Sequence, residues 1–168
     1  MYQNAIYTFD GHGLTDANGN LGDGEYFYNT YTTSYPTATY FRNRSGTNSN
    51  STVYLNNLAS ASFSEMLLAV NVGCGTAATH SSYGNFTRKM KEKGCNAAIG
   101  FYAAIGAAQA DYWYKRFFVH ANNGYSFSDS AYKAIADTKN YTGSYSGIDS
   151  CMLYGTGTLK LKPARYGN

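Results

Sequence analysis

The sequence predicts an α/β domain built around a mainly parallel β-sheet. Short apolar segments bounded by glycines alternate with longer segments in which apolar residues recur every three or four positions. Strands that alternate with helices in this way favour parallel pairing, with helices packed on the sheet. A length of 168 residues suits one domain with a substantial core, so we assign residues 1–168 to a single domain.

Two apolar runs in the first half of the chain are predicted to be strands. The first is Ala5 to Phe9, and the second is Met66 to Val72, which leads into Gly73-Cys74-Gly75. Residues 14–52 between them show no clear periodicity, so we expect a long irregular connection, which in proteins is usually functional or mobile. A short strand or hairpin arm is expected at residues 53–55.

The second half of the chain continues the alternation of helices and strands. Asn85 is a suitable cap for a helix over residues 86–93 that ends at Gly94. Residues 97–101 form an apolar strand, and residues 107–122 have the apolar spacing of a packed helix face. The remaining predictions are a helix over 128–139, capped by Ser126 or Ser128 with Asp129 in its first turn, and closing strands at 151–154 and 158–161.

Composition and charge argue against nucleic acid and membranes as partners. The net charge is +3, and the one basic cluster, Arg88 to Lys93, is typical of the solvated face of a helix. No apolar run approaches the roughly 20 residues of a membrane span, and Met1 to Asn4 do not form a signal peptide. Abundant Tyr, Gly, Asn, Ser and Thr are frequent in secreted bacterial proteins. We therefore expect an extracellular or cell-surface protein that derives from a longer precursor.

A histidine and a cysteine follow the two predicted strands of the first half. His12 stands between Gly11 and Gly13, and Cys74 stands between Gly73 and Gly75. A thiol becomes a useful nucleophile beside a base, and histidine serves as that base near neutral pH. Because the carboxyl ends of parallel strands open into one crevice, we expect the two residues to meet there. His80 and His120 are the competing histidines, but neither ends a strand.

The remaining cysteines, Cys95 and Cys151, lie in apolar segments. Free cysteines in such positions usually behave as small hydrophobic residues. Since the chain holds three cysteines, at least one has no intrachain partner, and we expect that one to be Cys74. A disulfide between Cys95 and Cys151 is possible but is not the expected state.

These motifs resemble caspase-like cysteine peptidases, the group that includes caspases, metacaspases, clostripain and gingipain. The segment Phe9 to Gly13 resembles the histidine motif, residues 16–25 resemble the acidic loop that follows it, and the strand ending at Cys74 resembles the nucleophile strand. The later segments 93–101, 113–118 and 124–131 follow the order of the bacterial members. The resemblance implies a caspase-like three-layer sandwich from the histidine strand onward.

The same resemblance implies the chemistry of a cysteine endopeptidase. His12 and Cys74 would form a catalytic dyad, and the backbone N–H groups of Gly13 and Cys74 would stabilise the oxyanion. The alternatives are a catalytically degenerate caspase-like domain used for binding, and a thiol amidase or transpeptidase that acts on cell-wall peptides. Peptide or protein is the expected substrate of the endopeptidase, and no cofactor is required.

The resemblance also locates the surface that would bind the substrate. Members that cleave after Arg or Lys carry an acid two residues before the cysteine or beyond the next strand, where this chain has Val72 and residues 101–104. A small or apolar residue before the scissile bond is therefore expected, unless Asp10, Asp111 or Asp149 reaches the site. The predicted substrate-binding residues are Asp10, Val72, Phe101, Tyr102 and Ala103.

The acidic, glycine-rich loop after His12 also invites comparison with a calcium site. Alternate oxygen side chains can encircle a hard cation, but Leu21 and Phe27 stand where an EF-hand loop needs glycine and glutamate. A solvated turn is the expected state. The candidate calcium ligands are Asp16, Asn18, Asn20 and Asp23, with Glu25 next in the series.

The predicted domain departs from the family at its N-terminus. A caspase-like domain has two strand-helix units before the histidine strand, and these 168 residues have no room for them. The sheet is therefore expected to be N-terminally incomplete, with an exposed edge beside Ala5 to Phe9. We expect an upstream chain cut away from this one to cover that edge, or else a second copy of the domain or part of the 14–52 connection.

Overall fold

The computed structural model describes residues 5–27, 39–49, 52–143 and 147–161. Its central sheet has the strand order β1-β6-β9-β10. The pairs β1–β6 and β6–β9 are parallel, and β9–β10 is antiparallel. The predicted α/β fold with a mainly parallel sheet is thus confirmed for this part of the chain. The four strands are β1 (Ala5–Asp10), β6 (Met66–Val72), β9 (Ala97–Phe101) and β10 (Cys151–Gly155).

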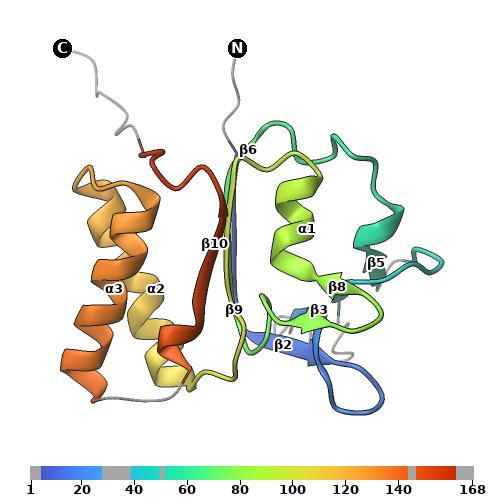
Figure 1. The fold of residues 1–168 in the computed structure, drawn as a ribbon, viewed down its shortest axis with the longest axis horizontal. Helices are drawn as coiled ribbons and strands as arrows, with labels where there is room; N and C mark the ends of the chain where they lie inside the picture. The colour runs from blue at the N-terminus through green and yellow to red at the C-terminus, as the bar shows by residue number, and fades with distance from the viewer. Residues whose placement is uncertain (1–4, 28–38, 50–51, 144–146, 162–168) are drawn as a thin grey trace, which may run out of the picture.

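Helices lie on both faces of the central sheet. Figure 1 shows the sheet edge-on, with α2 (Ala107–Asn122) and α3 (Phe127–Thr142) on one side and α1 (Phe86–Glu92) on the other. The predicted bounds of α2 are confirmed, and α3 is longer than predicted by one residue at its start and three at its end.

Two helices begin at the caps that the sequence predicts. The Asn85 side chain accepts a hydrogen bond from the Arg88 backbone N–H at 2.8 Å, and Ser126 Oγ accepts one from the Asp129 N–H at 3.1 Å. Each bond satisfies a donor in the first helical turn that has no partner within the helix.

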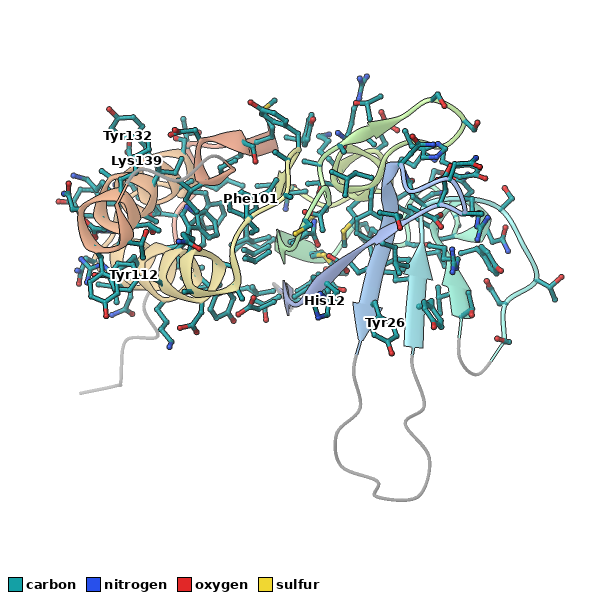
Figure 2. The ribbon with its side chains drawn as sticks, turned by 90° about the horizontal axis from the view of Figure 1, so that it is seen from below. His12, Tyr26, Phe101, Tyr112, Tyr132 and Lys139 are labelled. Atoms are coloured by element: carbon teal, nitrogen blue, oxygen red, sulfur yellow. The ribbon has the colours of Figure 1, made fainter. Side chains whose placement is uncertain are left out.

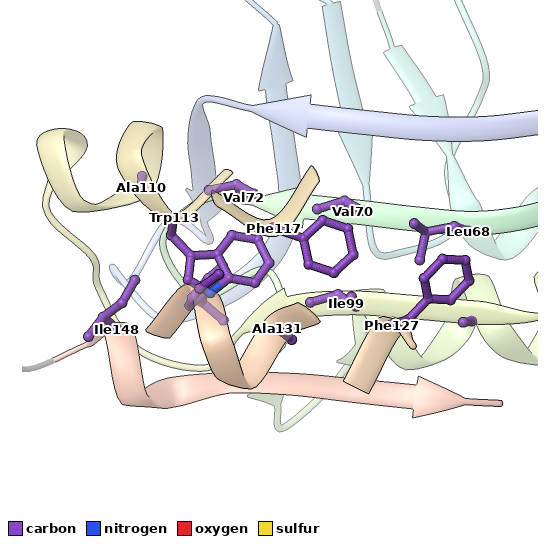
Figure 3. Packing of buried hydrophobic residues seen from close by; sticks show 13 residues of the cluster. Leu68, Val70, Val72, Ile99, Ala110, Trp113, Phe117, Phe127, Ala131 and Ile148 are labelled. Carbon is purple, nitrogen blue, oxygen red and sulfur yellow. The ribbon is translucent and has the colours of Figure 1, made fainter. Parts of the chain in front are cut away.

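Aromatic residues of α2 fill the main hydrophobic core between this helix pair and the sheet (Figure 3). The Trp113 and Phe117 rings stack with centroids 5.3 Å apart, and Phe101 of β9 meets Trp113 edge-on at 5.0 Å. All three side chains are fully buried, so the spacing of three and four residues in α2 reflects a packed face. The sheet adds Leu68, Val70, Val72, Ala97 and Ile99, and α3 adds Phe127, Ala131 and Ala134.

A second sheet forms where the sequence predicts an irregular connection, so that prediction is wrong. Its strand order is β2-β3-β4-β5, with antiparallel β2–β3 and β3–β4 pairs and a parallel β4–β5 pair. Gly24 has a φ of +124°, and a Cβ there would lie 1.9 Å from the Phe41 carbonyl oxygen. Glycine in this sheet is thus required by close strand packing, although its sequence signature is that of a turn. The strands are β2 (His12–Thr15), β3 (Leu21–Phe27), β4 (Thr39–Arg42) and β5 (Thr52–Tyr54).

A smaller core joins this second sheet to the central one. Phe86 and Met90 of α1 are fully buried there, and Phe41 of β4 meets Phe86 edge-on at 5.1 Å. Tyr7 of β1 and Phe63 pack against the same cluster. The short elements nearby are η1 (Leu55–Asn57), β7 (Thr79–His80) and β8 (Gly84–Asn85).

The end of the described chain differs from the prediction. The expected strand at residues 158–161 is reduced to one isolated bridge between Lys160 and Ser126, so it does not pair with β10 across the 155–157 turn. Residues 148–150 form the 3₁₀ helix η2 (Ile148–Ser150) before β10. None of the described helices has the length and hydrophobicity needed to cross a bilayer.

Replacing Phe117 by Ala should lower the free energy of unfolding by about 3–5 kcal/mol, because it opens a cavity beside Trp113. Val119→Ala on the same helix removes a side chain that is 43% exposed, and it should cost far less. Urea titration followed by circular dichroism measures both values. Equal losses in the two variants would contradict the core described above.

Candidate functional site

His12 and Cys74 lie at the same end of two adjacent parallel strands. β1 and β6 pair in register up to Asp10 and Val72, and the Gly11 N–H continues the pairing with a hydrogen bond to the Val72 carbonyl at 3.0 Å. Cys74 follows β6, and His12 begins β2. The segments expected to meet at the carboxyl ends of neighbouring strands do so.

The two segments touch through their backbones. A Cβ at Gly13 would lie 1.7 Å from the Cys74 carbonyl oxygen and 3.2 Å from the Cys74 nitrogen. A Cβ at Gly73 would lie 2.9 Å from the Gly11 oxygen and 3.1 Å from the Gly13 nitrogen. Glycine is therefore a steric requirement on both sides of this contact. It brings into contact the backbones of Gly13 and Cys74, whose amides are the two expected oxyanion donors.

The Cys74 thiol is held by the loop that follows β9. Its Sγ lies 3.5 Å from the Ile105 carbonyl oxygen, to which it donates, and the Ile105 N–H donates to Sγ at 3.4 Å. The Gly75 N–H adds a bond to the Ala103 carbonyl at 3.1 Å. The loop between β9 and α2 thus fixes the position of the sulfur, which is half-buried.

The His12 side chain is exposed. Figure 2 shows it where the helical half of the molecule meets the second sheet, with Tyr26 on the neighbouring strand. Among the described residues, no hydrogen bond joins its imidazole to the Cys74 thiol. The fold therefore brings the two segments to the same end of the sheet without a hydrogen bond between the imidazole and the thiol.

The other two cysteines are less suited to nucleophilic chemistry. Burial raises the pKa of the Cys95 thiol and raises that of Cys151 to about 12. A thiol with a raised pKa holds little thiolate at neutral pH. All three cysteines are free, as expected.

The predicted substrate-binding residues divide by exposure. Val72 and Phe101 are fully buried and belong to the main core, so their side chains are closed to a substrate. Asp10 is exposed, Tyr102 is 53% exposed, and Ala103 is half-buried. Accessible contacts near Cys74 therefore come from the end of β1 and from the loop after β9.

Two acidic side chains lie close together at the carboxyl end of β1. Partial burial raises the pKa of Asp10, and the nearby Asp111 carboxylate on α2 raises it further, while Lys115 opposes them. Lys115 forms an ion pair with Asp111 at 2.7 Å. Asp149, the third candidate counter-charge, is paired with Lys139 at 2.5 Å.

The competing histidines both have acidic partners. The Nδ1 atom of His80 accepts hydrogen bonds from the backbone N–H groups of Ser82 and Tyr83 at 3.0 and 3.3 Å, so the proton sits on Nε2. Nε2 donates to Asp16 Oδ2 at 3.0 Å, and the ring is buried. His120 on α2 pairs with Asp137 at 2.8 Å. His80 therefore ties the loop after Cys74 to the β2–β3 loop.

The candidate calcium ligands have other partners. The Asn20 side-chain amide donates to Asp16 Oδ2 at 3.0 Å, and the backbone N–H groups of Asn18 and Asn20 donate to Oδ1. The Asn20 side-chain bond is the largest cause of the lowered pKa of Asp16, and the backbone bonds lower it further. Asp23 is buried and forms an ion pair with Arg42. In the described ranges, no three His, Cys, Asp or Glu side chains are placed to hold a metal ion.

The sequence offers Glu25 only as a further calcium candidate and does not predict its burial. Glu25 of β3 is fully buried and lies opposite Gly13 in the β2–β3 pair. Tyr7 donates its hydroxyl to Glu25 Oε2 at 2.6 Å, whereas Oε1 has no partner among the described residues. Burial raises the pKa of Glu25 to about 8 despite the Tyr7 bond. Because glutamate is seldom buried, the sequence gives no sign that Glu25 lies in the interior.

Comparison with known proteins adds no assignment to this geometry. No protein-family model matches the sequence, and a search of curated proteins found no significant match.

Gly13→Ala should break the contact between the two segments, because its Cβ would overlap the Cys74 carbonyl. We expect a loss of about 1–3 kcal/mol in the free energy of unfolding. Gly106→Ala is the matched control, since its Cβ would meet only the flexible end of Gln109. Chemical denaturation compares them, and a Gly13→Ala protein as stable as the control would contradict the contact.

Glu25→Gln should flatten the pH dependence of stability. Between pH about 4.5 and about 8, folded Glu25 keeps a proton that the unfolded chain loses, so the wild-type free energy of unfolding falls as pH rises. The slope from this group is at most about 1.4 kcal/mol per pH unit.

The control is Glu65→Gln, which removes an exposed carboxylate and should keep the wild-type slope. Urea denaturation at several pH values measures both. A wild-type slope in Glu25→Gln would show that Glu25 titrates normally in the folded protein.

Proposed function

We propose that this domain is a thiol-dependent endopeptidase with His12 as base and Cys74 as nucleophile. One observation carries the proposal: Gly11–Gly13 and Gly73–Cys74 are in contact at the carboxyl ends of β1 and β6. This contact joins the two segments that carry the proposed base, the proposed nucleophile and the two proposed oxyanion donors. Those are the groups that acyl transfer from an amide requires.

In the proposed reaction, His12 takes the proton of the Cys74 thiol, and Sγ attacks the carbonyl carbon of the peptide bond. The N–H groups of Gly13 and Cys74 stabilise the oxyanion. The carbon–nitrogen bond then breaks as the His12 imidazolium donates its proton to the leaving amine. Water, deprotonated by His12, hydrolyses the acyl-thioester, which releases the carboxylic acid and restores the thiol. Both reacting groups belong to this chain, so the proposal includes no cofactor.

A caspase-like arrangement is the fold that we propose for this chemistry. It is supported by the order of elements: a histidine after one strand, a cysteine after the neighbouring parallel strand, a buried strand, and two helices on one face. The extracellular or cell-surface location proposed with it rests on composition.

One observation favours a second candidate, a degenerate domain that binds peptides without cleaving them. The Cys74 thiol is bonded to both backbone groups of Ile105, and His12 does not contact it through a hydrogen bond within the described chain. In the proposed enzyme, this loop must release the sulfur when substrate binds. In the binding domain, the sulfur would stay where it is.

Cys74→Ala and His12→Ala should each abolish cleavage of a mixed peptide library, read by mass spectrometry, while circular dichroism stays unchanged. Cys151→Ala is the control, and it should keep activity at a cost of about 1–2 kcal/mol in stability. The library should include both apolar and basic residues before the scissile bond. Basic residues are included because the Asp10 and Asp111 carboxylates lie near the carboxyl end of β1.

Iodoacetamide labelling near neutral pH gives a second readout. Cys74 should react faster than Cys95 and Cys151, whose pKa values are raised by burial. Intact library peptides together with slow labelling of Cys74 would favour the binding domain. Equal losses of activity in Cys74→Ala and Cys151→Ala would refute the assigned nucleophile.

A further inference from the structure

The central sheet ends in a strand with an open side. β1 stands first in the order β1-β6-β9-β10, and no described strand pairs with its outer edge. The N–H groups of Ala5 and Gly11 point toward β6, where they bond to Glu65 and Val72 at 3.1 and 3.0 Å. Because backbone groups alternate along a strand, those of Ile6, Thr8 and Asp10 point outward.

β1 carries little of the usual protection of an edge strand, since Asp10 at its end is its one charged side chain. Its six residues contain no proline and no lysine, and its irregularity lies between Ala5 and Ile6, so the strand is regular from Ile6 to Asp10. Ile6 is 42% exposed and Thr8 is exposed. The main core draws residues from β6 and β9 but none from β1. An open edge that is rich in β-branched and aromatic residues favours pairing with another strand.

We propose that a second copy of this chain covers the edge, through antiparallel pairing of β1 with β1 around a twofold axis at Thr8. This register opposes Thr8 to Thr8 of the partner subunit and Ile6 to Asp10 of the partner subunit. Every outward N–H and C=O of the three residues then meets a partner, as in hydrogen-bonded antiparallel pairs.

The edge is complementary to itself in this register. The twofold axis sets the threonines opposite each other, a favourable cross-strand pair, and keeps the two Asp10 carboxylates apart. If the twofold axis lay at Tyr7 instead, Asp10 would lie beyond the end of the partner subunit's β1. The outward N–H and C=O of Asp10 would then have no partner in that strand. Pairing around Thr8 joins the two central sheets into one continuous sheet across the dimer.

Analytical ultracentrifugation over a range of concentrations tests the proposal on the whole chain. We expect the mass to rise to twice the 18.3 kDa of one chain. Thr8→Lys and Thr8→Pro should restore the single-chain mass, because a charge or a missing N–H blocks an edge. The N–H of Thr8 points away from β6, so the proline removes no bond within the subunit. Thr158→Lys, at an exposed position far along the chain, should leave the dimer intact.

Thr8→Cys gives a positive signal for the register. Opposed residues of a hydrogen-bonded antiparallel pair have Cα atoms about 5.5 Å apart, which a disulfide can bridge. Mild oxidation of this variant should therefore yield a disulfide-linked dimer whose crosslink maps to position 8 by mass spectrometry, and Thr158→Cys should not. A single-chain mass at all concentrations would overturn the proposal, as would a dimer that survives both Thr8→Lys and Thr8→Pro. Since the readout is mass, its outcome does not depend on the proposed peptidase activity.

Discussion

The pairing of β1 with β6 is the constraint on which the rest of the molecule depends. It joins the start of the described chain to its middle and lets the Gly13 and Cys74 backbones touch where the two strands end. Substituting a larger residue at either Gly13 or Gly73 would separate the segments. The position of the loop after β9, and with it the environment of the Cys74 sulfur, follows from the same contact through the bonds of Gly75 and Ile105.

The two faces of the central sheet are built differently. The face under α2 and α3 is apolar, and its aromatic rings hold Phe101 and Val72 in place. The face toward the second sheet buries polar groups as well, among them Asp23, Glu25, Asn43 and Asn71. Buried polar groups are costly unless they are paired, so this half depends on specific partners such as Tyr7 for Glu25 and Arg42 for Asp23. The candidate site lies at the boundary between these two kinds of interior.

Local patterns predicted the elements that rest on local forces. The spacing of Trp113 and Phe117, the all-apolar β9 and the Asn85 cap each indicate one structure without tertiary help. The second sheet could not be found in this way, because its strands contain glycines and charged residues whose burial depends on distant partners. Glu25 is an example, since only the position of Tyr7 gives its carboxyl group a place inside. For the site, strand ends and flanking glycines indicated that His12 and Cys74 meet, but nothing local predicted that Ile105 would hold the thiol.

The long separation between β1 and β6 has a consequence for how the chain folds. Each described residue of β1 pairs with a residue about sixty positions later, so the strand has no local partner in the central sheet. Closing such a loop costs entropy before any contact is gained, and folds rich in these pairings form slowly. During synthesis, β1 gains its partner strand in the central sheet only after residues 66–72 have emerged from the ribosome. In that interval a chaperone or a neighbouring nascent chain has access to the same backbone groups that later build the edge of the sheet.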